Sequence, residues 1–189
     1  MTLKMELAGR TQQGTDRAGN EDQYLIADLR KALKIEATSL PIGDDSWLLG
    51  TSDRYLLAVA DGVSGNPRGD IAGSIATGTV TEYVLNTMPW FYHLQPEGED
   101  DLKDELEEAV QRCNRRVRAM SQRAGDAHLM ATALTMAYIV GHRMFVVHAG
   151  HARCYLLRDG KLAQVTIDDT IAERLAEDGL ISTVAFGMV

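Results

Sequence analysis

The chain contains 189 residues, of which 45% are hydrophobic and 24% are charged, and its net charge at pH 7 is −8. This length suits a single domain, residues 1–189, that buries a substantial core. The acidic balance and the lack of a groove of Lys and Arg residues exclude nucleic acid as a partner.

The first half of the chain predicts two strands and one helix. A strand is expected over Tyr24–Ala27, followed by an irregular segment over about residues 34–53. The apolar run Tyr55–Ala60 predicts a strand that is covered on both faces. A helix is expected from Asp70, whose charge suits the positive helix start, with a buried stripe at near-helical spacing: Ile71, Ile75, Val80, Val84 and Met88.

The second half predicts a long helix followed by antiparallel strands. After a polar loop at residues 95–100, the helix places one apolar stripe toward the core: Leu102, Leu106, Val110, Cys113, Val117 and Met120. Strands are expected over Thr132–Val140 and Met144–His148, and a further pair flanks Asp159-Gly160, a dipeptide typical of tight hairpins. Outer helices with meandering antiparallel strands indicate an α+β layered domain.

The cysteines and the apolar segments of the sequence indicate the cellular compartment in which the protein is expected. Cys113 and Cys154 are far apart and lack CxxC spacing, which argues against a disulfide framework or a zinc-thiolate site and fits a reducing environment. The first residues contain no apolar stretch of signal-peptide length, and the longest apolar segment is too short to cross a bilayer. We therefore expect a cytoplasmic protein without a membrane partner.

Two short stretches carry the chemical signal. Residues 14–22 read GTDRAGNED directly before the first strand, and residues 58–65 read AVADGVSG at the end of a buried strand. Taken singly, each has a plain structural explanation, a polar turn in the first case and a turn that ends a strand in the second.

Together, these stretches resemble the type 2C (PPM) family of metal-dependent protein serine/threonine phosphatases, in its bacterial form. The family's opening motif has the spacing of Arg17, Glu21 and Asp22, and its Asp-Gly motif matches Asp61-Gly62. Residues 130–134 (MATAL) and 146–153 (VVHAGHAR) resemble its Gly-Thr-Thr strand and its Gly-Asp-Ser-Arg segment. Residues 168–170 (DDT) stand where the family often has Asp-His-Thr.

The resemblance implies a fold, two cofactors and a substrate. The fold would be two antiparallel sheets packed face to face with helices outside, an α-β-β-α sandwich. Two Mg2+ or Mn2+ ions would activate a water molecule that hydrolyses phosphoserine or phosphothreonine in a protein substrate. Asp61 would bridge the two metals, the Gly62 carbonyl, Asp22 and Glu21 would hold metal or its waters, and Arg17 would bind the substrate phosphate.

Two departures from the family pattern bear on activity. The Asp of Gly-Asp-Ser-Arg is replaced by His151, an imidazole that should bind Mg2+ poorly, so we interpret His148 and His151 as a strand end and a loop without a metal role. The later Asp-Gly and Asp-Asn motifs have no match in residues 171–189, which predicts a C-terminally shortened domain and a weak or inactive phosphatase. An exposed sheet edge would then favour self-association. The explanations left open are a piece of a longer protein, a degenerate relative, or completion by a second copy.

Two other functions compete with this one. A serine hydrolase is suggested by Ser64 after a strand, but Asn66 occupies a position where the nucleophile elbow requires glycine. A pseudophosphatase that binds a phosphorylated partner, or scaffolds an assembly, is favoured by the missing carboxylates. It is opposed by the joint presence of Arg17, Glu21, Asp22 and Asp61.

Overall fold

The main structural unit is an antiparallel sheet with two helices on one side. The computed structural model describes residues 5–15, 19–30, 32–37, 47–49, 54–62, 68–88, 99–124 and 130–169. The elements are β1 (Asp22–Asp28), β2 (Ala32–Lys34), β3 (Trp47–Leu49), β4 (Arg54–Gly62), α1 (Gly69–Asn86), α2 (Glu99–Ala124), β5 (Thr132–Val140), β6 (Arg143–Ala149), β7 (Tyr155–Arg158) and β8 (Lys161–Gln164). The main sheet has the order β1-β4-β5-β6, and β2–β3 and β7–β8 form two smaller ladders.

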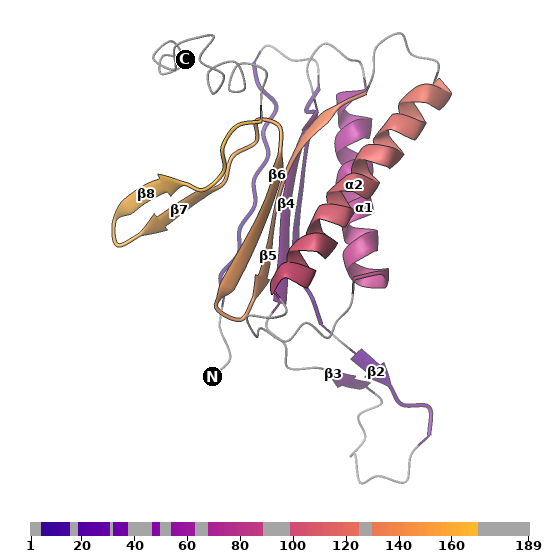
Figure 1. Ribbon diagram of the computed structural model, residues 1–189, viewed down its shortest axis with the longest axis vertical. Coiled ribbons are helices and arrows are strands. Elements are labelled where there is room, and N and C mark those ends of the chain that lie inside the picture. Colours follow the sequence, from indigo (N-terminus) through magenta and orange to yellow (C-terminus); the bar gives the residue numbers. More distant parts are fainter. Residues whose placement is uncertain are drawn as a thin grey trace.

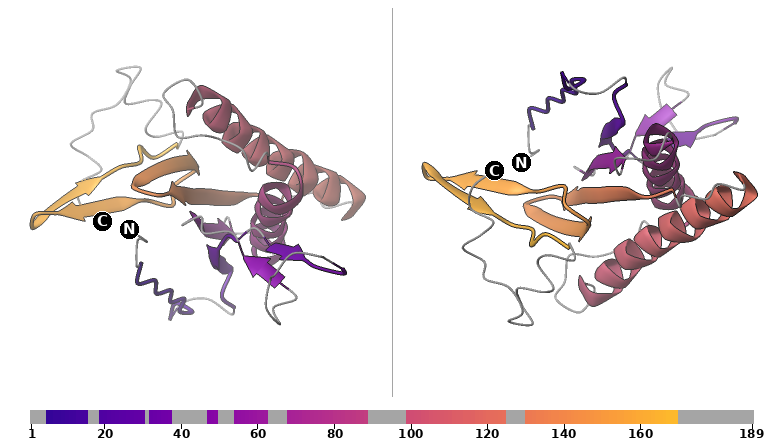
Figure 2. Two further views of the ribbon diagram at one scale, coloured as in Figure 1. Left: turned by 90° about the horizontal axis from the view of Figure 1, so that it is seen from below. Right: turned by 90° about the horizontal axis from the view of Figure 1, so that it is seen from above.

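The helices and the β7–β8 hairpin lie on opposite sides of the main sheet. Helices α1 and α2 lie on one side of the main sheet, and the β7–β8 hairpin projects on the other side (Figures 1 and 2). All five strand pairings in the three described sheets are antiparallel. The predicted α+β class with antiparallel sheets is therefore confirmed.

The core lies between the main sheet and the helices. Along β4, Leu56, Ala58 and Ala60 are at most 2% exposed and face the helices. Val59, which lies between Ala58 and Ala60, is 48% exposed on the opposite face, because successive side chains of a strand point to opposite sides. The prediction that this strand is covered on both faces is therefore wrong at Val59.

Helix α1 buries the later part of the predicted stripe, with Val80, Val84 and Met88 at most 4% exposed, but its first turns pack differently from the prediction. Its start, with Asp70 in the first turn, agrees with the prediction. Ile71, however, is 41% exposed, and the buried positions are mostly small: Gly69, Ala72, Gly73, Ala76, Thr79, Val80, Tyr83 and Val84. Small side chains allow the helix axis to approach the sheet closely, so this face packs inward although it contains fewer large apolar residues.

Helix α2 follows its predicted stripe up to its last turns. Leu102, Leu106, Cys113 and Val117 are buried as expected. Met120 is 41% exposed, and the next residue, Ser121, is buried instead, where its Oγ accepts a hydrogen bond from the Met130 backbone N–H at 3.0 Å. The Met130 N–H and the Ser121 hydroxyl are thereby paired, as buried polar groups must be if they are not to destabilise the fold.

The two cysteines are both free, as the sequence predicted. The Cys113 thiol is buried and donates to the Ala76 carbonyl oxygen at 3.3 Å. Burial raises its pKa to about 11, so the thiol stays protonated and unreactive at neutral pH.

Two hairpins have turns that can be compared with the sequence. The turn between β5 and β6 contains Gly141 at φ 56°, and the turn between β7 and β8 contains Asp159 and Gly160 at φ 51° and 73°. Both turns fall where they were predicted. The segment around residues 34–53 was expected to be irregular, but it contains the short β2–β3 ladder, in which Lys34 pairs with Trp47.

Several large apolar side chains on the open side of the sheet and on the β7–β8 hairpin are exposed. On the sheet, Tyr24 is 46% exposed, and on the hairpin, Leu157 and Leu162 are each 67% exposed. A groove of about 400 Å³ separates the open face from residues 7–10 and from the base of β7. Among the helices that the structure describes, none combines the length and the apolar character needed to span a membrane.

Candidate metal and phosphate site

Two carboxylates meet at one end of the main sheet. Strands β1 and β4 pair so that Asp22 lies directly opposite Asp61. Directly opposed residues share a face, with their Cβ atoms roughly 4.5–5.5 Å apart. Since Leu25 and Ala58 face the helices, the alternation of side chains directs Asp22 and Asp61 to the open side of the sheet. The pairing thus concentrates negative charge at this point.

The junction of β4 with α1 is packed backbone against backbone. A Cβ atom added to Gly62 would lie 2.5 Å from the carbonyl carbon of Gly69, the first residue of α1, so only glycine fits there. The Glu21 carboxylate also reaches this helix start, because a Cβ on Gly69 would lie 3.0 Å from its Oε2 atom. A helix N-terminus carries partial positive charge, which suits this carboxylate.

A shallow pocket joins these groups. It has a volume of about 170 Å³ and is lined by Gln12, Gly14, Gly19, Asn20, Glu21, Asp22, Asp61 and Gly62. The Asn20 side chain closes one wall, since its Oδ1 accepts from the Asp22 backbone N–H at 3.0 Å and its Nδ2 donates to Thr11 Oγ1 at 2.6 Å. A larger cavity of about 450 Å³, between α2 and β5, has no carboxylate in its lining. The oxygen-rich pocket is therefore the better place for a cation.

Strand β5 fixes the backbone of Asp61. Gly62 is paired with Thr132, and the Thr132 hydroxyl donates to the Asp61 carbonyl oxygen at 2.9 Å. Thr132 belongs to the motif of residues 130–134, whose resemblance to the Gly-Thr-Thr strand assigns this residue no role. The structure gives it one, namely to hold the end of β4 in place.

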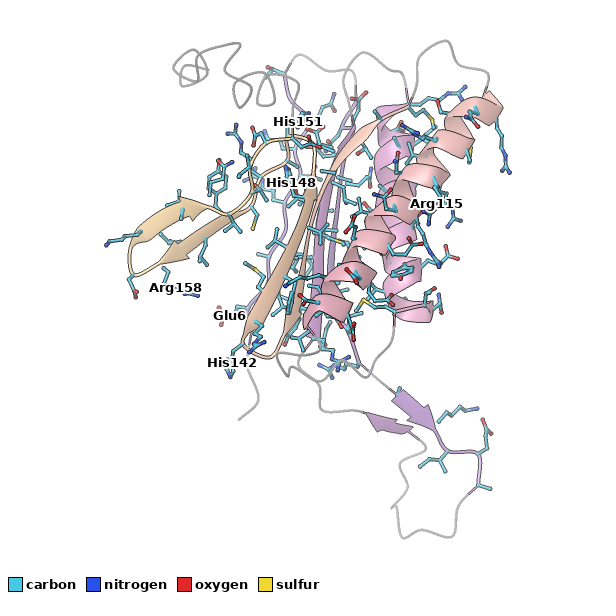
Figure 3. The ribbon with its side chains drawn as sticks, in the orientation of Figure 1. Glu6, Arg115, His142, His148, His151 and Arg158 are labelled. Atoms are coloured by element: carbon cyan, nitrogen blue, oxygen red, sulfur yellow. The ribbon has the colours of Figure 1, made fainter. Side chains whose placement is uncertain are left out.

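His151 lies beside Asp61, which the sequence interpretation did not anticipate. Its Nδ1 atom is 3.5 Å from Asp61 Oδ2, and both side chains are close to half exposed. Figure 3 shows His151 and His148 toward one end of the main sheet and His142 at the other end. His148 is engaged differently, through a 2.7 Å contact between its Nδ1 atom and Thr135 Oγ1.

A second pair of contacts anchors the loop that carries His151. Arg153 and Asp168 form a forked ion pair, with Nε–Oδ1 and Nη2–Oδ2 distances of 2.8 and 2.6 Å. The Asp169 backbone N–H donates to the Gly150 carbonyl oxygen at 2.7 Å. The motif residues near position 168 therefore brace the loop between β6 and β7.

We expect Asp168→Asn to lower the free energy of unfolding by on the order of 1 kcal/mol at neutral pH, because one partner of the pair is half exposed. The hydrogen bonds from Arg153 lower the pKa of Asp168, and nearby His148 adds to this. A lowered folded-state pKa gives stability that is present above the unfolded value, about 3.9, and is lost as the pH falls through the folded value. Denaturation curves should therefore converge for wild type and variant in acid. A difference that does not change with pH would contradict the assignment.

Comparisons with known proteins give these motifs a context. A family model described as protein phosphatase 2C matches residues 36–176. The serine/threonine protein phosphatase PstP of Mycobacterium tuberculosis is 31% identical over 182 residues, which cover 96% of this chain and 28% of PstP. The chain belongs to the protein phosphatase 2C family.

Solved structures of the phosphatase 2C family agree with the fold. The crystal structure of the M. tuberculosis phosphatase PstP/Ppp has a TM-score of 0.64 and 30% identity, and the match covers 93% of this chain and 60% of that one. A structure of the PstP catalytic domain in complex with two manganese ions has a TM-score of 0.55 and 26% identity, over 87% of this chain and 65% of that one. The sequence match covers 28% of PstP, so this chain spans little more than a quarter of the full PstP length.

The donors present fit the cations expected of this family. Carboxylate and carbonyl oxygens are the ligands preferred by Mg2+ and Mn2+, with waters completing the coordination. Within the part of the chain that the structure describes, no three His, Cys, Asp or Glu side chains converge on one point, so waters would fill much of the shell. Arg17, assigned to the phosphate, and Ser64 of the rival hydrolase motif lie outside the described residues.

Proposed function

We propose that this chain is a metal-dependent protein serine/threonine phosphatase that hydrolyses phosphoserine and phosphothreonine in proteins. The observation that carries the proposal is the pairing of Asp22 with Asp61 at the end of adjacent strands. The match to PstP, which covers 96% of this chain, supports it. The structure of a PstP catalytic domain with two manganese ions supports the choice of cofactor.

Each matched residue receives one role in this proposal. Asp61 and Asp22 would hold the cations, with the Gly62 carbonyl and Glu21 as further donors or as partners of bound water. When bound, the two divalent ions neutralise phosphate charge and activate a water molecule. Thr132 fixes the Asp61 carbonyl, and the close contact of Gly62 with Gly69 fixes the strand end, so the carboxylates are positioned before substrate arrives. Arg17 would orient the phosphate through paired hydrogen bonds.

The assay that tests the proposal measures phosphate release in millimolar Mn2+. Phosphoserine and phosphothreonine peptides should be hydrolysed, EDTA should stop the reaction, and a phosphotyrosine peptide of the same sequence should react more slowly. We expect low turnover, because a two-metal site carries about four positive charges and the matched inner carboxylates are Asp22 and Asp61. Peptide binding without any hydrolysis would instead support the pseudophosphatase, an alternative that the matched relatives, all named as phosphatases, do not support.

The role of Arg17 predicts a separation of substrate binding from metal binding. Arg17→Ala should raise KM for a phosphopeptide by roughly 10- to 100-fold, because this is the affinity that the loss of one charge-assisted hydrogen bond typically costs. The Kd for Mn2+ should stay within about twofold. Arg158→Ala, on the projecting hairpin, is the matched control and should change neither (Figure 3). Equal losses of peptide and Mn2+ binding would show that Arg17 supports the fold rather than the ligand.

Partner, location and domain organisation are further parts of the proposal. A phosphorylated protein is the expected partner, a cytoplasmic location suits the free cysteines, and residues 1–189 are treated as a single domain. Self-association through an exposed sheet edge stays a prediction. The outer strands of the described sheet, β1 and β6, are the edges available for it.

A further inference from the structure

The imidazole of His151 is brought to Asp61 by the packing of three neighbouring strands. Asp61 on β4 is paired with Ala133 on β5. Gly150, which follows β6 at φ 101°, packs so closely on Ala133 that an added Cβ would lie 2.7 Å from the Ala133 Cβ. A methyl group on β5 and a glycine at the turn leave room for His151 to reach across β5 to the Asp61 carboxylate.

The loop that carries His151 is held on both sides. On one side the Gly150 carbonyl accepts from the Asp169 backbone N–H, and on the other side Arg153 forms its forked pair with Asp168. Asp61 is itself fixed by Thr132. Both the imidazole and the carboxylate therefore project from braced backbone, which reduces the entropy lost when they bind a common ligand.

The separation of the two donor atoms fits a single ion. Two ligand atoms held at about 2.1 Å from one cation lie roughly 3.0 Å apart at an octahedral angle and roughly 3.4 Å apart at a tetrahedral angle. The distance of 3.5 Å between His151 Nδ1 and Asp61 Oδ2 is close to the upper of these values. It is also longer than a good hydrogen bond between the same atoms would be.

We propose that His151 is a metal ligand together with Asp61, and that it biases the site toward divalent transition ions over Mg2+. Imidazole nitrogen is a good donor for transition ions, increasingly from Mn2+ to Co2+, whereas Mg2+ takes oxygen ligands almost exclusively. A neutral imidazole in place of a carboxylate also removes one negative charge, which weakens the attraction for Mg2+ further. The inference rests on the proposed function, because it assigns an additional ligand to the same metal site.

Calorimetric titration of the whole chain with Co2+ and with Mg2+ at pH 8 tests the selectivity. His151→Ala should raise the Kd for Co2+ by at least about tenfold and the Kd for Mg2+ by less than about twofold. His151→Asp should instead strengthen Mg2+ binding and reduce the preference for Co2+. His142→Ala, at the opposite end of the sheet, is the matched control and should leave both values unchanged (Figure 3).

A spectroscopic measurement separates a ligand from a group that only orients Asp61. Pulsed electron paramagnetic resonance of the Mn2+-loaded wild type should show coupling to a directly bound nitrogen, and His151→Ala should lose it while His142→Ala keeps it. Thermal unfolding of each metal-free variant shows that it is folded.

The outcomes distinguish the inference from the function on which it rests. Nitrogen coupling with the predicted change in selectivity supports the proposal. If His151→Ala leaves both the coupling and the Co2+ affinity unchanged, His151 is not a ligand, although a metal site that depends on Asp61 stands. If the wild type binds Co2+ and Mn2+ no better than Asp61→Ala does, the metal site and the phosphatase proposal are overturned together.

Discussion

Replacing Asp61 with asparagine is expected to lower Mn2+-dependent phosphatase activity by more than roughly 100-fold and to remove the stabilisation of the fold by Mn2+. Asparagine keeps the size of the side chain but loses the negative charge that opposes the cations, and a neutral amide oxygen is a much weaker ligand. The measurements are phosphate release in millimolar Mn2+ and the shift of Tm on addition of Mn2+.

The same substitution should leave the metal-free protein folded. Asp61 and Asp22 are directly opposed across β1 and β4, so removing one of two like charges relieves repulsion between them. The matched control is Asp28→Asn, a carboxylate at the far end of β1 whose pair with Arg30 is exposed and contributes little. An Asp61→Asn protein that Mn2+ still stabilises to the wild-type extent would place the cations elsewhere.

Gly62→Ala should be the most destabilising small substitution near the site. The added methyl group would lie 2.5–2.6 Å from three backbone atoms of Gly69, and backbone cannot move aside as a flexible side chain can. Overpacking of this kind costs about 1–3 kcal/mol, and we expect the upper end or more because the clash lies between a strand and a helix start. Mn2+ affinity should fall as well, since Asp61 shares the displaced strand end.

Gly78→Ala provides the matched control in helix α1. Apart from the backbone of α1 itself, no atom lies within 4 Å of a Cβ built at Gly78. Alanine also favours the helix over glycine, so this variant should be more stable by about 0.5–1 kcal/mol. Equilibrium unfolding in denaturant measures both variants under the same conditions. If Gly62→Ala were as stable as wild type, α1 would not rest on the end of β4, and the backbone contact that positions the site would be wrong.

Local residue preferences determined much of the secondary structure. Asp159-Gly160 specifies its hairpin because both residues adopt positive φ angles, and the two apolar runs on either side of Gly141 indicate the β5–β6 pair. The helix starting near Asp70 and the burial of Val80 and Val84 were also predictable, but the buried face of its first turns was not. Which stripe of α1 packs inward depends on how closely the sheet can approach, and this favours Ala72 and Ala76 over Ile71, a choice that hydrophobic spacing alone does not reveal.

The sequence by itself determined the family and the candidate residues Arg17, Glu21, Asp22 and Asp61, because short motifs keep their order and spacing along the chain. Only the tertiary structure decided that Asp22 faces Asp61 and that His151 lies beside Asp61. His151 and Asp61 are brought together by the register of β4, β5 and β6 and by the small side chain of Ala133 between them. Contacts between distant segments depend on strand pairing and on the space left by intervening side chains, and neither is encoded in any local stretch of the sequence.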